Sequence, residues 1–469
     1  MLHSPPARAS ATIPRSALIA IVLAFVAVHL ALAVVDFHRP EVFLRADRAV
    51  MRMRDIDQLL AAGNWTDARE YLGSHGVVGD YAAHAMLYGI GGRPAVILCQ
   101  VLLLFASGFA VVRLAALLGM SRALQAASLA LYFTLPNSLV FAHQLSTEAL
   151  EVPLLVISTC LVCESLHRSS TPLLLASALL LAVATLIRPI TLLWPAAVAA
   201  IAALQGRRLF AVAFLAVACA PVLLWMTFIF QQTGTFGLGE SNHSLARNLY
   251  LKLAETRATM PRTEAAEVGD RYLTRGEQGR MSALEYANVA LRHPWPFVSE
   301  AGRDALVFFG KSGIERLTRD YGSDAQFNAF EHVQGGWRQQ LDTGNPLMTL
   351  RDLWRIAGMT LLVSLSASLL FVTLMIFALY GAFFLARRVH CRSETSVVRF
   401  TAANLIVLPV YILAFSLVVV ALQSRQRAPC EFALVLLAVY GWDRFRSRTR
   451  KERRTVAERR PSGQRADPA

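Results

Sequence analysis

The sequence predicts an all-α polytopic membrane protein with about ten transmembrane helices and short interfacial helices on its outer face. Of its 469 residues, 55% are hydrophobic, and the mean hydropathy is +0.45. The apolar residues gather in runs that approach the ~20 residues a helix needs to cross a bilayer core. Lys and Arg are concentrated in alternate short connections between these runs. Together these features exclude a soluble globular protein of this length.

The apolar runs can be assigned as ten spans, at residues 17–36, 94–118, 123–142, 146–166, 172–189, 191–205, 209–230, 358–386, 398–422 and 429–445. The first run continues into Val35-Asp36-Phe37 without a small-x-small cleavage pattern, which predicts a retained anchor rather than a signal peptide. The run 191–205 is the shortest and follows Arg188-Pro189, so a re-entrant segment or a tightly paired hairpin is the alternative there.

Basic residues in the short connections predict the orientation. They precede the first span and occupy every second connection, at Arg8, Arg15, Arg113, Arg122, His167, Arg168, Arg207, Arg208, Arg387, Arg388 and Arg392. From Arg444 onward, ten Lys and Arg stand against three Asp and Glu, a net charge of +7 out of the chain's +14. Because Lys and Arg accumulate in cytoplasmic loops, both termini are expected in the cytoplasm.

This charge distribution also bears on partners. Membrane lipids with anionic headgroups would attract the basic tail. A nucleic-acid partner is not expected, because no nucleic-acid-binding fold or aromatic platform accompanies the tail.

The topology divides the chain into four regions: an N-terminal transmembrane module at 1–230 with a first outer loop at 37–93, a large extracytoplasmic loop at 231–357, C-terminal transmembrane helices at 358–445 and a basic cytoplasmic tail at 446–469. Both outer regions are too long to be plain connectors. Helix-period patterns at Met51–Ala62 and Pro296–Phe309 predict amphipathic helices lying at the outer interface.

Common soluble-enzyme motifs are missing from the chain. It has no Walker loop, no G-x-G-x-x-G, no G-x-S-x-G and no paired Cys/His metal spacing. Cys160 and Cys163 form a C-x-x-C, but on a lipid-embedded helix that spacing indicates packing. The two halves show no sequence repeat, which disfavours a transporter. Any chemistry is therefore expected from polar residues at the outer face.

Carboxylates in the first outer loop are the first candidates. Asp47 follows the first span, and Asp80 stands beside Tyr81 and His84, which are candidates for substrate binding together with His143. A carboxylate in apolar surroundings can take a proton from a hydroxyl or amine. The alternative is a solvated ion network on an interfacial helix, made of Arg48, Arg52, Arg54, Asp47, Asp55 and Asp57.

A second group of candidates surrounds the turn at 143–147. Glu148 and Glu151 open the run 146–166, just after His143, and acids at the edge of a span are costly unless they serve a cavity or a partner. Helix capping by Ser146 or Thr147 with an acid in the first turn is the alternative. Arg188 ends another span on the same predicted side, where it either faces the same cavity or snorkels to water.

Arg425 and Arg427 stand in the hydrophilic break 423–428 between the last two apolar runs. Guanidinium groups bind phosphate oxygens in a bidentate geometry that other side chains do not offer. These two arginines are therefore candidates for a lipid phosphate.

The order of these features resembles the GT-C superfamily of polyprenyl-phosphate-sugar glycosyltransferases, which includes protein mannosyltransferases and lipid A aminoarabinose transferases. The stretches that carry the resemblance are Asp47 followed by Leu59-Leu60-Ala61-Ala62-Gly63-Asn64-Trp65, then the run from Asp80 to Gly89, Val112-Arg113-Leu114-Ala115, Leu186-Ile187-Arg188-Pro189, Arg292-His293-Pro294-Trp295-Pro296-Phe297 and Ser424-Arg425-Gln426-Arg427-Ala428-Pro429. The resemblance covers nearly the whole chain up to the basic tail.

The resemblance implies transfer, with inversion, of a hexosyl or pentosyl group from a polyprenyl-phosphate donor to a lipid, glycan or protein acceptor. It implies an extracytoplasmic site in the cell inner membrane, with Asp47 as the catalytic carboxylate and Arg425 and Arg427 on the lipid phosphate. The family places a second acid directly after this Asp, and here Arg48 stands there. Asp80, Glu148 or another carboxylate would then supply it, and the need for a divalent cation stays open.

Two other classes fit the same topology. A membrane transporter or lipid flippase would need charged groups near the bilayer midplane or broken helices. A non-catalytic membrane assembly protein would give no reason for Asp47 and the arginine pair to share one side. The spans are nearly free of acids and the polar groups gather at one face, which disfavours the transporter. A charge-neutral substitution at Asp47 distinguishes the assembly protein, which should survive it, from a transferase, which should not.

Overall fold

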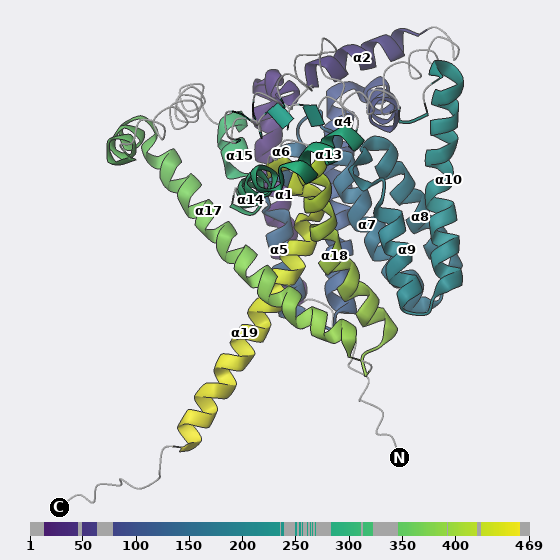
Figure 1. The fold of residues 1–469 in the computed structure, drawn as a ribbon. Coiled ribbons are helices and arrows are strands. Elements are labelled where there is room, and N and C mark those ends of the chain that lie inside the picture. The colour runs from purple at the N-terminus through teal and green to yellow at the C-terminus, as the bar shows by residue number, and fades with distance from the viewer. Residues whose placement is uncertain are drawn as a thin grey trace, which may run out of the picture.

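The computed structural model describes residues 14–45, 49–62, 78–234, 236–238, 249–250, seven positions between 253 and 268, 283–310, 313–321, 346–391, 393–419 and 424–459. Within some of its helices, including 346–365, 424–426 and 450–459, only the backbone belongs to the described part. All regular structure in these residues is helical, which confirms the all-α class (Figure 1).

The helices of the N-terminal half are α1 (Arg15–His38), η1 (Pro40–Leu44), α2 (Ala49–Ala61), α4 (Val78–Leu117), α5 (Arg122–Phe133), α6 (Pro136–Phe141), α7 (Thr147–Arg168), α8 (Thr171–Ile187), η2 (Pro189–Thr191), α9 (Trp194–Leu204) and α10 (Arg208–Thr233). Those of the C-terminal half are α13 (Ala283–Arg292), α14 (Pro294–Gly310), α15 (Ile314–Tyr321), α17 (Pro346–His390), α18 (Ser396–Val419), η4 (Ser424–Cys430) and α19 (Glu431–Arg459). The helices predicted around 51–62 and 296–309 are present as α2 and α14.

Among the described residues, six helices are long and apolar enough to cross a membrane, in α1, α4, α7, α10, α17 and α18. The chain is thus a multi-pass α-helical membrane protein. Each of the ten predicted spans contains helix in its described part, but the count of about ten is not confirmed. At 1.5 Å per residue, α5, with 12 residues, and α9, with 11, reach only about 17 Å. The helix α19 carries many charged residues in its second half.

Proline divides the predicted span 123–142 into two helices. The helix α5 ends at Phe133, and α6 begins at Pro136. Leu135 between them has φ −62° and ψ 120°, the extended conformation that a residue before proline prefers. A break at this point brings the segment 136–147 across one end of the bundle.

Glycine bends α4 in the same region. Gly92 has φ +63°, a left-handed conformation that residues with a side chain rarely adopt. The bend separates an N-terminal arm, residues 78–90, from the apolar part, which begins near Pro94 as predicted for the span 94–118. The arm carries Asp80 and His84 back over the bundle.

The segments expected outside gather at one end of the bundle, which we call the loop-rich end. There the amide of Leu145 donates to the carbonyl of Phe43 at 2.9 Å, and Arg45 donates to the carbonyl of Asp320 at 2.7 Å. At the opposite end, Arg388 donates to the carbonyl of Leu118 at 3.0 Å. In Figure 1, α2 lies at the top and the end of α19 at the bottom.

The packed core runs the length of the bundle around α7. This helix is the most buried of the six candidate spans, and Leu155, Val156 and Cys163 are fully covered on it. Cys160 and Cys163 are free thiols within this core, as the packing interpretation expected. The helices α17 and α19 cross where Gly381 faces Gly441. The two backbones can approach closely there because neither residue has a side chain, and a Cβ at either position would overlap the backbone of the other helix.

Candidate functional site

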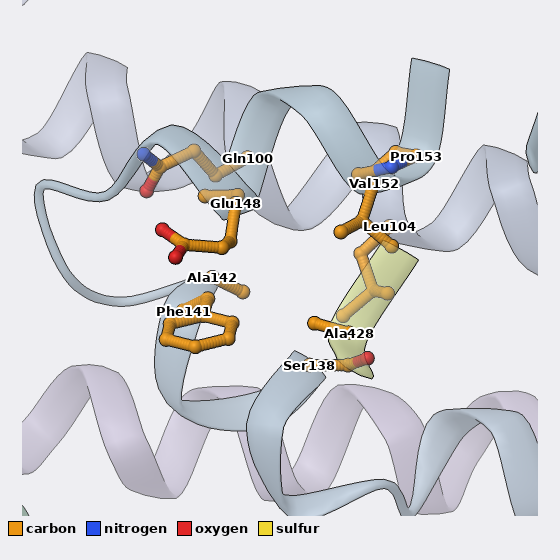
Figure 2. Close-up of a pocket in the computed structure, with 10 residues that line it drawn as sticks. Gln100, Leu104, Ser138, Phe141, Ala142, Glu148, Val152, Pro153 and Ala428 are labelled. Atoms are coloured by element: carbon orange, nitrogen blue, oxygen red, sulfur yellow. The ribbon is translucent and has the colours of Figure 1, made fainter. Parts of the chain in front are cut away.

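A small pocket lies where the first turn of α7 meets α4, α6 and η4. It is mostly apolar, with Glu148 and Gln100 as its main polar groups. In Figure 2 the carboxylate of Glu148 lies on the same side as Gln100 and Phe141, while Leu104, Val152 and Ala428 line the other side. The remaining lining residues are Ser138, Ala142, Ala149 and Pro153.

The residues before α7 orient Glu148. Ser146 donates to Oε2 of Glu148 at 2.5 Å, and Thr147 donates to the same oxygen at 2.9 Å. Ser146 occupies the N-cap position, but its side chain makes no hydrogen bond to the helix backbone. The capping alternative holds for the positions, with Ser146 at the N-cap and Glu148 in the first turn, while the hydroxyl of Ser146 is bonded to the acid rather than to the helix backbone. The helix N-terminus still favours a negative charge at this position.

Arg188 holds both acids of α7. Its Nη1 lies 3.4 Å from Oε1 of Glu148 and 3.3 Å from Oε2 of Glu151. Of the two predicted orientations, it adopts the one that faces inward. Pro189 favours this placement, because Arg188 is extended, with φ −149° and ψ 117°, and ends α8 there. Burial by itself lowers the pKa of Arg188, but Glu148 and Glu151 raise it above its ordinary value.

A second set of ion pairs joins α2 to the arm of α4. Arg52 Nε lies 2.8 Å from Oδ2 of Asp80, and His84 Nδ1 lies 2.9 Å from Oδ1. His84 also contacts the amide of Gln100 at 3.3 Å, which links this set to the pocket wall. The solvated network proposed for α2 did not foresee this partner, because Arg52 donates to the buried Asp80 of α4.

Acids of both sets of ion pairs affect the pKa of Arg52. Burial lowers its pKa, yet Asp80, Glu148 and the half-buried Tyr81 raise it above its ordinary value. Tyr81, predicted to bind substrate, thus lies near Arg52.

Gly79 allows the two sets of ion pairs to lie close together. A Cβ at Gly79 would lie 2.7 Å from the carbonyl carbon and oxygen of Leu186, so only glycine allows the arm of α4 to touch the end of α8. Asp80 consequently acts on Arg188, and Glu148 acts on Arg52. We refer to Arg52, Asp80, Glu148, Glu151 and Arg188 as the acid–arginine cluster.

Arg427 is buried directly before Ala428, which lines the other side of the pocket. Its Nε donates to Oε1 of Glu431 at 3.0 Å, its Nη1 donates to the carbonyl of Phe308, and its guanidinium lies 3.9 Å from the ring centre of Phe371. Asn137 also donates to Glu431, at 2.8 Å. The sequence indicated an arginine at the membrane surface, whereas the structure covers Arg427 fully. The next residue, Ala428, lines the pocket.

His143 belongs to a different group of residues. Its Nδ1 lies 2.5 Å from Asp36, and its Nε2 lies 2.8 Å from Nδ1 of His29. All three side chains are buried. The structure therefore places this predicted substrate-binding residue against α1, behind the wall formed by Phe141 and Ala142.

Two candidates cannot be placed. Asp47 and the side chain of Arg425 lie outside the described residues, as does the stretch around Trp65. Within the described residues, no three His, Cys, Asp or Glu side chains are grouped so that they could hold a metal ion.

Sequence reasoning missed the roles of Gln100, Gly79 and Glu431 and placed Glu151 mainly as a capping acid. Gln100 is the one strongly polar side chain of the run 94–118 before Arg113, and Glu431 is the one acid inside the run 429–445 before Asp443. Each was a visible polar exception in an apolar run. Gly79 gave no such signal, because its role depends on the approach of Leu186 from another helix.

Comparisons of the chain with protein-family models, curated proteins and solved structures gave no match.

Proposed function

We propose that this protein is an integral membrane glycosyltransferase that moves a sugar from a polyprenyl-phosphate donor to an extracytoplasmic acceptor. The observation that carries the proposal is the pocket between Glu148 and Ala428, the residue that follows the buried Arg427. A transferase with a lipid donor needs a proton acceptor and a cationic phosphate site on either side of the reacting sugar. Here a carboxylate and an arginine segment from distant parts of the chain meet around one pocket.

The reaction follows from these groups. The acceptor oxygen forms a bond to the anomeric carbon, while the bond from that carbon to the phosphate oxygen breaks and its electron pair stays on the phosphate. A carboxylate takes the acceptor's proton. The resemblance assigns this role to Asp47, and the pocket favours Glu148 among the described carboxylates. Asp80 is held by Arg52 and His84, which fits a supporting role.

Arg427 would stabilise the charge that grows on the departing phosphate. Its Nη2 is buried without a hydrogen-bond partner among the described residues, which leaves one donor for a phosphate oxygen. A well-placed donor of this kind contributes about 3 kcal/mol to transition-state stabilisation. Arg425, two residues earlier, is the second candidate phosphate ligand.

The proposed orientation puts the loop-rich end outside the cytoplasm and both termini inside, in the inner membrane of the cell. It is supported by the position of the basic connections, since Arg113, Arg168 and Arg388 lie at the opposite end from the pocket.

The test is sugar transfer in membranes that contain wild type or single variants, with labelled polyprenyl-phosphate sugars as donors. Glu148→Gln and Arg427→Ala should each lower transfer at least about 100-fold, given the value of a base and a phosphate donor. Matched controls are Glu164→Gln, an ion-paired acid at the far end of α7, and Arg388→Ala, an ion-paired arginine at the opposite end. Asp47→Asn, measured in parallel, decides between the two candidate bases.

Sugar transfer by Arg427→Ala at the wild-type rate would show that Arg427 is not the phosphate ligand. A wild-type protein that moves labelled donor lipid between leaflets without transferring sugar would replace the proposal with a lipid transporter. An inserted wild-type protein with neither activity would favour the assembly protein.

A further inference from the structure

Gln100 brings an unmet hydrogen-bond acceptor to the wall of the pocket. It lies in the apolar part of α4, it is fully buried, and its side chain lines the pocket together with Glu148. Its amide oxygen, Oε1, has no hydrogen-bond partner among the described residues. Buried polar atoms are nearly always hydrogen-bonded, because an unmet acceptor is costly. This oxygen therefore calls for a donor that the described part of the chain does not supply.

The nitrogen of the same amide is held by His84. Nε2 of Gln100 lies 3.3 Å from Nε2 of His84. The other ring nitrogen of His84, Nδ1, lies 3.0 Å from the carbonyl oxygen of Asp80 and 2.9 Å from its carboxylate oxygen Oδ1. Both of these atoms are acceptors, so the hydrogen is on Nδ1, and the lone pair at Nε2 accepts from the amide. Turning the amide over would place its oxygen against this lone pair, so the orientation is fixed.

The unmet oxygen shares a corner of the pocket with the carboxylate of Glu148. Figure 2 shows both groups on the same side of the pocket, with the oxygen of Gln100 turned toward Glu148. Amide and carboxylate oxygens both accept hydrogen bonds, so this corner suits a ligand that carries several hydroxyl groups. Leu104 and Val152 on the other side suit the carbon–hydrogen faces of such a ligand.

A structural role accounts for only half of this amide. The hydrogen bond from Nε2 to His84 ties the arm of α4 to the membrane-spanning part of the same helix. Oε1 takes no part in that link. The remaining half of the amide is thus available to a bound molecule.

We propose that Gln100 is a specificity-determining residue, whose amide oxygen accepts a hydrogen bond from one hydroxyl of the sugar bound beside Glu148. The inference rests on the proposed function. The sugar of a polyprenyl-phosphate donor and a sugar acceptor offer the same hydroxyl chemistry, and either would satisfy this oxygen. An analogue without the hydroxyl leaves the oxygen unmet, so the pocket binds it more weakly.

The first measurement is binding to wild type in lipid nanodiscs by isothermal titration calorimetry. One series of probes consists of farnesyl-phosphate glucose, mannose and arabinose, each with a single hydroxyl replaced by hydrogen or by fluorine. Methyl glycosides with the same replacements form the second series, because they lack the lipid phosphate of a donor. At one ring position, both replacements should weaken binding about tenfold, since neither can donate to an amide oxygen.

The series that shows the effect identifies the source of the hydroxyl. An effect in the phosphate series assigns it to the donor sugar, and an effect in the methyl glycosides alone assigns it to the acceptor. Both results support the proposed contact, and neither depends on whether a variant folds.

The variant Gln100→Leu separates ligand binding from a structural role. The parent sugar should bind to it as weakly as the analogue that lacks the hydroxyl, so the tenfold ratio should fall to about one. A glutamine that only holds His84 would alter the affinity for all probes alike and keep the ratio. The matched control is Gln125→Leu at the opposite end of the bundle. Gln125 is a buried glutamine of α5 whose Nε2 donates to the carbonyl of Met120 at 2.9 Å, and its loss should leave the ratio unchanged.

A ratio that survives in Gln100→Leu would overturn the inference, as would a wild type that binds no probe or binds all of them equally. Sugar transfer by the same preparations tests the proposed function separately. A Gln100-dependent ratio without transfer would contradict the proposed function and leave the hydroxyl site in place. Transfer with no such ratio would remove the hydroxyl site alone.

Discussion

Replacing Gly79 with alanine tests the packing that assembles the acid–arginine cluster. A Cβ at this position would lie 2.7 Å from the carbonyl of Leu186 and 2.8 Å from the amide nitrogen of Ile187. These are backbone atoms, so no side-chain rotation relieves the overlap. The arm of α4 would have to move away from α8 by roughly 0.7 Å to reach ordinary carbon–oxygen contact.

Gly79→Ala has one unfavourable and one favourable effect on the free energy of unfolding. Overpacking of this kind destabilises by about 2 kcal/mol, whereas alanine in a helix is favoured over glycine by about 1 kcal/mol. The net expectation is a loss of about 1 kcal/mol. The matched control is Gly302→Ala in α14, which is exposed and whose added Cβ meets nothing within 4 Å. Gly302→Ala gains the higher helix propensity of alanine without a steric overlap, so this variant should be more stable by about 1 kcal/mol.

The assay is thermal unfolding of both variants and wild type in one detergent, read by helical circular dichroism. The same substitution should shift the Tm in opposite directions at the two sites. Sugar transfer should fall in Gly79→Ala alone, because the shift of the arm separates Asp80 and Arg52 from Arg188. A Tm increase in Gly79→Ala equal to that of the control would refute the close approach of α4 and α8.

Three further predictions address other parts of the molecule. His143→Ala leaves Asp36 buried without its closest partner and should cost about 3 kcal/mol in thermal unfolding, with a smaller loss in His143→Gln; equal stability to wild type would contradict the buried pair. Gly381→Leu should lower the yield of folded protein by size-exclusion analysis, because any side chain there overlaps the backbone of α19; a normal yield would disprove that crossing. The hydrogen bonds from Arg388 to Glu394 lower the pKa of that acid, so their stabilisation is present above its unfolded pKa and is lost as the pH falls through the folded one. Glu394→Gln should therefore cost less than about 1 kcal/mol at neutral pH and nothing in acid, and an equal loss at both values would exclude the pair.

The ends of the helices show how much of the fold can be predicted from local sequence. The apolar run through 123–142 favoured one continuous span. The structure breaks it at Leu135, whose extended conformation is the one that a residue before proline prefers. By contrast, the arm of α4 before Gly92 ends where a double glycine permits a left-handed residue, as the sequence Gly91-Gly92 suggests.

Arg427 shows which part of the candidate site could not be predicted from local sequence. Its place in a short polar break between two apolar runs indicated exposure at the membrane surface. The structure instead covers it with Phe308 and Phe371, from segments more than 50 residues away. Nothing in the local sequence specifies these neighbours. The same is true of Arg52, which pairs with Asp80 of another helix.

Composition and apolar run length determined that this protein is a helical multi-pass membrane protein, because the hydrophobic effect acts on each segment separately. The grouping of polar candidates on one side also followed from the order of the segments. The tertiary structure alone decided that Glu148 and Glu151 share Arg188, that Gly79 brings Asp80 to them, and that His143 pairs with Asp36 instead. These pairings depend on which helices touch and at what height, and such contacts between distant segments leave no periodic signal in the chain.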